Sequence, residues 1–356
     1  MSKKRRQERR VLTRLKRIGL QLCRSIEEGS FPELYIPSRS TTNIVYDARL
    51  RQYVLGKKKI RRSSRVVTHL RPLTQLLWIA QIAKQLIREG KSSTLRDIYY
   101  LSMAEEGVDF KSQRESDKTI ADLEALLGAA REDFHIFPEE RSAIFGDLTI
   151  EYTVPGYEGR QLNLTIHPDG VMIGPALATA EFVDTSAERV IAVEKGAMFT
   201  RFVEERVHER FRALIVHTAG QPPRATRLLL RRLNQELGLP VYIFTDADPW
   251  GMHIAMVIIS GSAQSAHIPG LAVPDAQWCG VWASDIERYE LPSERLTARD
   301  LKRVDELKRD PRYQRNPWKR ELQVFTRKKR KTELEAFSRH GLTFIVDQYL
   351  PERLGL

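Results

Sequence analysis

The stretch VYIFTDADPWG, residues 241–251, joins a short apolar run to two carboxylates. Val241 to Phe244 has the composition of a buried strand, and Asp246 and Asp248 follow at its carboxyl end. In doubly wound sheets, ligands collect outside the carboxyl ends of the strands, and Mg²⁺ is commonly held by one or two carboxylates. Acidic pairs also occur in solvated loops and as helix N-caps, so this stretch by itself leaves both interpretations open.

A second candidate strand, upstream, also ends in a carboxylate. The run ERVIAVEKG (188–196) is rich in β-branched residues, and Glu194 stands at its end. The apolar periodicity predicts the order strand 189–194, helix 197–207, strand 212–217, helix 224–237, strand 241–245 and helix 251–260. Such alternation predicts a parallel sheet with right-handed crossovers. Glu194, Asp246 and Asp248 are therefore expected to converge on one sheet edge as a metal site.

The segment SSTLRDIYYLSM (92–103) carries the second candidate site. It begins with good N-cap residues and is predicted to be helical. Residues four apart share a helix face, so Arg96 is expected beside Tyr100, with Tyr99 about a quarter-turn away. A tyrosine next to a permanent cation can attack a phosphodiester, because the guanidinium stabilises the developing phenolate. The alternative is that both tyrosines are half-buried helix aromatics with polar tips.

The sequence around that helix predicts a DNA-docking module. Helical patterns at 72–89, 94–103 and 115–127 are followed by two strand candidates at 133–137 and 148–154. Three helices and a hairpin form the winged-helix (CAP-like helix-turn-helix) pattern, which places one helix in the major groove of DNA. The fold class expected is therefore a multidomain α+β and α/β chain with a winged helix followed by a parallel-sheet domain.

Composition agrees with a nucleic-acid partner. The chain has 58 Lys and Arg against 46 Asp and Glu, a net charge of +12, and basic runs at 1–17 and 326–331. Its two cysteines lack the spacing of a disulfide framework or zinc site. No apolar run approaches a membrane span, and no signal peptide follows the basic start. An intracellular location is expected, in the cytoplasm or nucleoid, or in the nucleus of a eukaryote.

These motifs together resemble the A subunit of topoisomerase VI, the type IIB family related to the transesterase that makes meiotic double-strand breaks. The resemblance spans nearly the whole chain. It rests on IPSRSTTNIVYD (36–47), TLRDIYYLS (94–102), VEKGAMF (193–199), FTDADPWGMHI (244–254), GSAQSAH (261–267) and KTELEAF (331–337). The resemblance implies that Tyr100, and not Tyr99, is the attacking residue and that Arg96 assists it. It also implies that Glu194, Asp246 and Asp248 hold Mg²⁺ in a Toprim domain.

The resemblance further implies a mechanism and partners. Tyr100 would form a transient 5′-phosphotyrosyl link to double-stranded DNA and leave a free 3′-OH for religation. The tyrosine of one protomer would work with the metal site of another, so a homodimer is implied. EGKSS (89–93) lacks the first glycine of a phosphate-binding loop, and ATP is therefore expected on a separate ATPase B subunit in an A2B2 heterotetramer.

The domain organisation expected has four parts. A basic helical extension at 1–30 either docks on a partner or packs on its own domain, and a winged-helix domain with the catalytic tyrosine follows at 31–155. Gly and Pro concentrate in a connector at 156–185, and a Toprim metal-binding domain occupies 186–356. Two alternatives share part of this chemistry: a meiotic-type double-strand-break transesterase, and a Toprim nuclease that hydrolyses DNA without a tyrosine.

Overall fold

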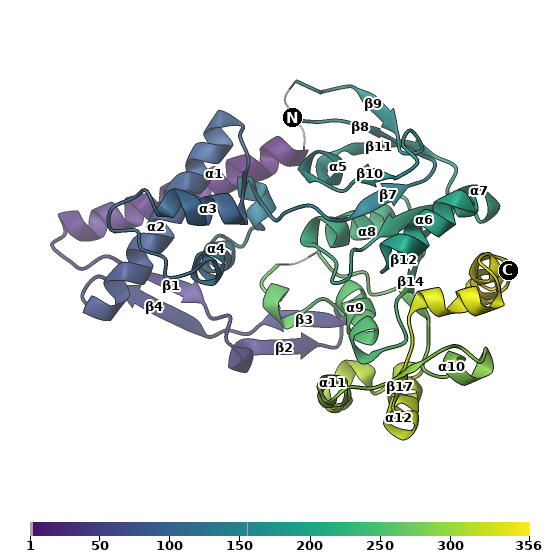
Figure 1. Cartoon of the computed structure of the whole chain (residues 1–356). Helices are drawn as coiled ribbons and strands as arrows, with labels where there is room; N and C mark the ends of the chain where they lie inside the picture. The colour runs from purple at the N-terminus through teal and green to yellow at the C-terminus, as the bar shows by residue number, and fades with distance from the viewer. Residues whose placement is uncertain (1–2, 155, 269) are drawn as a thin grey trace. The chain divides into compact units, whose positions relative to one another are not determined.

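The computed structural model describes residues 3–154, 156–268 and 270–356 of the 356-residue chain. The chain divides into two compact units, coloured along the sequence in Figure 1. Unit 1 comprises Met1–Glu139 with Ser262–Pro269, and unit 2 comprises Glu140–Gly261 with Gly270–Leu356. The segment 262–269 therefore belongs structurally to the N-terminal unit, although it follows most of the parallel sheet in sequence.

Unit 1 is mainly helical, with short two-stranded pairings at its margins. Its elements are α1 (Lys3–Glu27), β1 (Glu33–Pro37), η1 (Thr41–Asn43), β2 (Ile44–Asp47), β3 (Gln52–Leu55), β4 (Lys59–Ser63), α2 (Val67–Glu89), β5 (Ser93–Thr94), α3 (Leu95–Ser102), α4 (Gln113–Leu127), η2 (Arg131–Phe134), β6 (Ile136–Phe137) and η3 (Ala263–Ser265). The helices predicted at 72–89, 94–103 and 115–127 are thus confirmed as α2, α3 and α4. Both α2 and α4 end at a left-handed glycine, Gly90 and Gly128, which accepts that conformation without a Cβ clash.

The predicted hairpin between 133–137 and 148–154 is wrong. Within the first run only β6 is a strand, and it pairs in parallel with β5 of unit 1. In the second run, β8 (Leu148–Glu151) lies between two other strands of unit 2. Both runs contain strands, as expected, but local periodicity does not specify which strand pairs with which. The division of the chain falls at Glu139, before residue 155.

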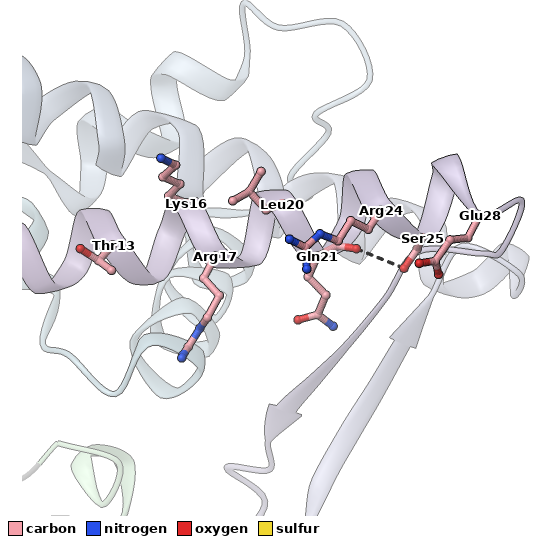
Figure 2. A pocket seen from close by; sticks show the side chains of 8 residues that line it. All are labelled: Thr13, Lys16, Arg17, Leu20, Gln21, Arg24, Ser25 and Glu28. Atoms are coloured by element: carbon pink, nitrogen blue, oxygen red, sulfur yellow. Dashed lines mark hydrogen bonds between the residues drawn. The ribbon is translucent and has the colours of Figure 1, made fainter.

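Helix α1 packs on its own unit through one face. Val11, Leu15 and Leu22 are buried and join the core formed by α2 and α4. The sequence left two roles open for this helix, docking on a partner or packing on its own domain, and the packing is observed. Figure 2 shows other side chains of the helix, among them Arg17 and Leu20, which line a shallow pocket on its surface. Helix α1 is thus amphipathic, with a basic surface beside its packed face.

Unit 2 is built around a six-stranded sheet. The strands of unit 2, inside and outside this sheet, are β7 (Ala143–Phe145), β8 (Leu148–Glu151), β9 (Gln161–Asn163), β10 (Val171–Met172), β11 (Glu181–Thr185), β12 (Arg189–Val193), β13 (Ala213–His217), β14 (Val241–Phe244), β15 (Gln277–Gly280), β16 (Glu294–Arg295) and β17 (Arg330–Lys331). Its helices are α5 (Pro175–Thr179), α6 (Gly196–Glu204), α7 (Val207–Arg210), α8 (Arg224–Glu236), α9 (Pro249–Ser260), α10 (Asp285–Arg288), α11 (Ala298–Arg309), η4 (Pro311–Tyr313), α12 (Trp318–Lys328), η5 (Leu334–His340), η6 (Ile345–Tyr349) and α13 (Leu350–Leu354).

The six-stranded sheet has the order β10-β7-β13-β12-β14-β15. The four strands from β13 to β15 are parallel, which confirms the predicted parallel sheet. On the β13 side, β7 and then the edge strand β10 extend the sheet by antiparallel pairing. Side chains of β12 alternate between two cores, because Val190 and Ala192 face one side while Ile191 and Val193 face the other. Helices therefore cover both faces of this sheet (Figure 1).

The strand order creates a switch point between β12 and β14. Helix α6, which follows β12, packs in one of the two cores, and helix α9, which follows β14, packs in the other. Chain segments leaving the carboxyl ends of these neighbouring strands therefore diverge to opposite faces. A crevice at such a position is where open α/β sheets bind ligands.

The predicted strands and helices of unit 2 are largely confirmed, with two differences. The helix expected at 197–207 is divided into α6 and α7, because Arg206 adopts a left-handed conformation between them. The segment 156–185 contains β9, β10, α5 and β11, which all belong to unit 2. Strands β9 and β11 pair on either side of β8 in a three-stranded antiparallel sheet.

Across residues 3–154, 156–268 and 270–356, no helix combines the length and apolar character needed to cross a lipid bilayer.

A buried ionic group links three parts of unit 1. Glu124 of α4 is fully buried, and its carboxylate accepts hydrogen bonds from Arg131 Nε (3.2 Å) and Nη2 (2.9 Å). His267 Nε2, from the segment 262–269, lies 3.1 Å from the same carboxylate. Because a buried charge without a partner is very unfavourable, this cluster ties the segment around His267 to the helical core.

We expect Glu124→Leu to lower the free energy of unfolding of the protein by about 3–5 kcal/mol, because Arg131 would stay buried without its counterion. Chemical denaturation followed by circular dichroism measures this change. Glu33→Gln is the control, since Glu33 forms an exposed pair with Arg61 and should change the transition little. Equal transitions for the two variants would show that the buried cluster does not stabilise unit 1.

Candidate active site on helix α3 and the carboxyl edge of the sheet

Helix α3 positions the candidate nucleophile. The helix begins at a capping box in which the Thr94 hydroxyl accepts from Asp97 N and the Asp97 carboxylate accepts from Thr94 N, both at 3.0 Å. Ile98 and Ser102 are buried and hold one face of the helix against unit 1. These contacts determine how the remaining side chains of this eight-residue helix are presented.

The two adjacent tyrosines of α3 differ in environment. Tyr99 is half-buried and packs against the core of unit 1, whereas Tyr100 is 54% exposed. Arg96 lies one turn before Tyr100, with its guanidinium carbon 5.9 Å from the Tyr100 ring centroid. Hydrogen bonding to Tyr100 and the negative charge of Glu139 raise the pKa of Arg96. Arg96 and Tyr100 therefore form an exposed pair, as the helical spacing predicts.

The predicted carboxylates lie at the carboxyl ends of β12 and β14. Glu194 follows β12 directly, and its Oε2 accepts a hydrogen bond from Asp246 N at 3.1 Å. Asp246 is buried just beyond β14. Burial, and then the charge of Asp246, raises the pKa of Glu194 to about 7, and burial raises the pKa of Asp246 to about 6. The half-buried Glu194 and the buried Asp246 therefore share a location that disfavours their ionisation unless a cation is near.

Asp248 has a different immediate role. Its Oδ1 accepts from Gly251 N at 2.6 Å and caps the N-terminus of α9. Gly251 is needed for this turn, since a Cβ there would lie 2.2 Å from the Asp246 carbonyl oxygen. Burial and nearby Asp300 raise the pKa of Asp248. Asp248 is close enough to affect the ionisation of Glu194 and Asp246, but one of its oxygens is already used.

A crossing segment, residues 331–334, passes over this edge of the sheet. Thr332 forms an antiparallel bridge with Ala247, and Leu334 N donates to Asp246 Oδ1 at 2.9 Å. Lys195 Nζ lies 3.1 Å from Asp246 Oδ2 and 3.3 Å from Glu333 Oε1. The crossing segment therefore orients one oxygen of Asp246, and Lys195 supplies a positive charge at the other.

These residues fit a Mg²⁺ ion held by few protein ligands. Across the described residues, no group of three or more His, Cys, Asp or Glu side chains is arranged closely enough to hold a metal ion. Mg²⁺ however keeps several water molecules and is often bound through only one or two carboxylates. Glu194 and Asp246 form such a pair. Burial raises the pKa of both side chains, so a cation beside them would favour their ionised forms. The chemistry of this donor set suits a hard divalent cation.

Comparison with known proteins places this chain in a family. Residues 71–136 match the family model "Type IIB DNA topoisomerase", and residues 189–354 match the model of the Toprim domain of the topoisomerase 6 A subunit and Spo11. The chain is 44% identical to the A subunit of type 2 DNA topoisomerase 6 from Methanothermobacter thermautotrophicus, over 97% of both chains. The chain belongs to the family of topoisomerase 6 A subunits.

Other curated relatives carry the same description. Identity to the topoisomerase 6 A subunit of Archaeoglobus fulgidus is 39%, over 98% of both chains. Identity to that of Halobacterium salinarum is 38%, over 95% of this chain and 94% of the relative. The Toprim match covers the strands that carry Glu194, Asp246 and Asp248, and the type IIB topoisomerase match covers α3.

Two features of this candidate site were not predicted from the sequence. The sequence shows Lys195 next to Glu194 in the VEKG motif, but it does not show that Lys195 pairs with Asp246 and Glu333. The contacts of Lys331 and Glu333 depend on strand pairing across more than eighty residues of chain. Lys331 Nζ lies 3.0 Å from Asp300 Oδ2, and Trp250 Nε1 donates to the other oxygen of Asp300 at 3.1 Å. This second network lies beside Asp248.

We expect Glu194→Gln to change the pH dependence of stability in the metal-free protein. Because folding raises the Glu194 pKa from 4.5 to about 7, the protonated form is favoured in the folded state. The resulting stability is fully present below pH 4.5 and is lost as the pH rises through 7. The variant should therefore match the wild type near pH 4 and exceed it at pH 8, by up to about 3 kcal/mol.

Thermal denaturation between pH 4 and 8, with and without Mg²⁺, measures this difference. Millimolar Mg²⁺ should stabilise the wild type and leave Glu194→Gln nearly unchanged. Glu188→Gln is the matched control, because Glu188 lies at the other end of β12 and is exposed. Parallel pH profiles for the wild type and Glu194→Gln would contradict the electrostatic account of this site.

Proposed function

We propose that the chain is the DNA cleavage and religation subunit of a type IIB topoisomerase and that Tyr100 is its nucleophile. The Tyr100 oxygen forms a bond to a backbone phosphorus as the bond from phosphorus to the 3′ oxygen breaks. The phenol loses its proton and the leaving 3′ oxygen gains one. Tyr100 is then linked to the 5′ phosphate, and religation is the reverse step. No water is consumed, so the phosphodiester energy is retained.

The observation that carries this proposal is the contrast between Tyr99 and Tyr100. An attacking residue must reach a phosphate of a duplex, which the exposed Tyr100 can do and the core-packed Tyr99 cannot without unpacking. Family membership supports the reaction class. The capping box and the buried face of α3 support a preorganised nucleophile, because they keep its backbone in one position.

Arg96 assists Tyr100 in this proposal. Its guanidinium is a permanent cation beside the phenol, and the contact between them strengthens as Tyr100 becomes negatively charged. The same cation can stabilise the charge that develops on the phosphate oxygens. Glu139 lies 3.8 Å from Arg96 and is itself exposed, so the guanidinium is near the nucleophile without being neutralised in a buried pair.

Glu194 and Asp246 would hold Mg²⁺, with Asp248 as the neighbouring third carboxylate. When bound, the ion supplies positive charge that offsets charge developing on phosphate oxygens. The chain's own residues prepare this site: Leu334 N orients Asp246, and Asp246 N orients Glu194. Lys195 keeps a positive charge next to Asp246.

The partners we propose follow from the reaction and the family. Double-stranded DNA is the substrate, and α2, α3 and α4 form the helical part of a winged-helix DNA-docking domain. Two copies of the chain cut the two strands, each tyrosine acting with the carboxylates of the other copy. An ATPase B subunit completes an A2B2 assembly and binds ATP. The exposed surface of α1 is the proposed contact for the B subunit (Figure 2).

We expect Tyr100→Phe to abolish covalent attachment of protein to DNA, because the variant lacks the attacking oxygen. Tyr99→Phe is the matched control and should retain attachment, since it removes only one hydroxyl from the same helix. The assay combines the chain, a B subunit, supercoiled DNA, Mg²⁺ and ATP, and is quenched with denaturant before 5′-linked protein is measured. DNA cleaved without attached protein would identify a hydrolytic nuclease instead. Cleavage with attachment but without relaxation would favour a meiotic-type transesterase.

We expect Arg96→Met to lower the cleavage rate by roughly 10²–10³-fold, the usual effect of removing one charge-stabilising donor. Single-turnover cleavage measures the rate, and circular dichroism checks that the exposed substitution leaves the fold intact. Glu139→Gln serves as the control, because it removes the carboxylate that pairs with Arg96 and should change the rate only a few-fold. A rate for Arg96→Met close to that of the control would remove Arg96 from the mechanism.

A further inference from the structure

We infer that a basic ribbon, residues 44–65 of unit 1, is an additional contact for duplex DNA, separate from the Arg96 and Tyr100 pair. The ribbon comprises β2, β3, β4 and their connections; β2 pairs with β3, and β4 pairs with β1 (Figure 1). This inference rests on the DNA-cleaving function proposed above. It extends that function by naming a surface that engages the duplex beyond the reacting phosphate.

Charge is concentrated in this segment. Residues 48–65 contain eight cations and no Asp or Glu: Arg49, Arg51, Lys57, Lys58, Lys59, Arg61, Arg62 and Arg65. The whole chain has a net charge of only +12, so this short segment supplies a large share of the excess. Such a density of like charge opposes folding unless a polyanion or solvent compensates it.

The central cations are available to a partner. Lys57, Lys58 and Lys59 are exposed, and within the part of the chain that the structure describes none of them forms an ion pair. Arg61 by contrast pairs with Glu33 across the β1–β4 register, at 2.6 Å. Arg49 and Arg65 are also exposed. The lysine run is therefore not neutralised by unit 1 itself.

The lysine run is held rigidly by a buried asparagine. Asn43 is 4% exposed, and its Nδ2 donates to Ser38 O at 2.7 Å and more weakly to Gly56 O and Lys58 O. Its Oδ1 accepts from Lys58 N at 3.0 Å. Gly56 permits this close approach, because a Cβ there would lie 2.5 Å from Asn43 Oδ1. One side chain therefore fixes the backbone that presents the three lysines.

The rest of the ribbon also suits a duplex. Strands β2 and β3 pair only with each other among the described strands, and a two-stranded ribbon fits the major groove of B-DNA. Their turn is closed by Asp47 Oδ1, which accepts from Arg49 N (2.8 Å) and Leu50 N (3.0 Å). Arg49 therefore projects from an ordered turn.

The test measures duplex binding directly. The full chain carrying Tyr100→Phe, in buffer without divalent metal, is titrated against a fluorescently labelled duplex at several salt concentrations. The combined change Lys57→Gln, Lys58→Gln and Lys59→Gln should weaken binding roughly tenfold or more at moderate salt. It should also lower the slope of log K against log salt by about 2–3, because three phosphate contacts are lost. The backbone bonds of Lys58 to Asn43 are retained in this variant.

The control removes the same charge elsewhere. Lys302→Gln, Lys308→Gln and Arg309→Gln on α11 remove three exposed cations and should leave affinity and slope nearly unchanged. Equal behaviour of the two triple variants would overturn the inference, even if Tyr100 proves to be the nucleophile. Unchanged duplex binding with weaker association to a B subunit would make the ribbon a protein-docking surface and would also overturn it. Absence of duplex binding by the parent chain would refute the proposed function as well.

Discussion

A half-buried and a buried carboxylate, Glu194 and Asp246, meet at the switch point of the parallel sheet, and the residues around them compensate their charge. Glu194 and Asp246 follow neighbouring strands whose chains diverge to opposite faces, so the topology itself brings them together. Burial opposes the ionisation of both side chains. The ammonium of Lys195 and the backbone N–H of Leu334 both contact the Asp246 carboxylate and favour its charged form. The C-terminal part of the chain thus supports a site that begins in the middle of the sequence. A divalent cation would complete the compensation of charge.

The candidate nucleophile depends on a different principle. Tyr100 is exposed on a short helix whose opposite face is buried and whose start is capped. Its activation needs a cation and access to phosphate, whereas the carboxylates need burial and a fixed geometry. These requirements conflict within one small site. Placing them on two compact units, as this chain does, lets each unit meet its own requirement.

Local patterns predicted the parts of this structure that depend on nearby residues. Helical spacing separated Tyr100 from Tyr99, and apolar runs ending in acids located Glu194 and Asp246 at strand ends. Long-range pairing was not encoded locally, so the hairpin expected after α4 was wrong, and the contacts of the crossing segment 331–334 were not foreseen. The sequence placed Asp248 correctly at this edge of the sheet, but it did not establish that the Asp248 carboxylate caps α9. The roles of these residues in catalysis stay predictions.

The central claim is that Tyr100 becomes covalently joined to a DNA 5′ end. Trypsin cleavage after Arg96 and Lys111 would release the peptide 97–111, which contains both tyrosines of α3. Mass spectrometry of the digested, nuclease-trimmed covalent complex would locate the attached nucleotide. The account predicts a 5′-phosphonucleotide on Tyr100 of this peptide. A nucleotide on Tyr99, on another peptide, or joined through a 3′ phosphate would contradict it.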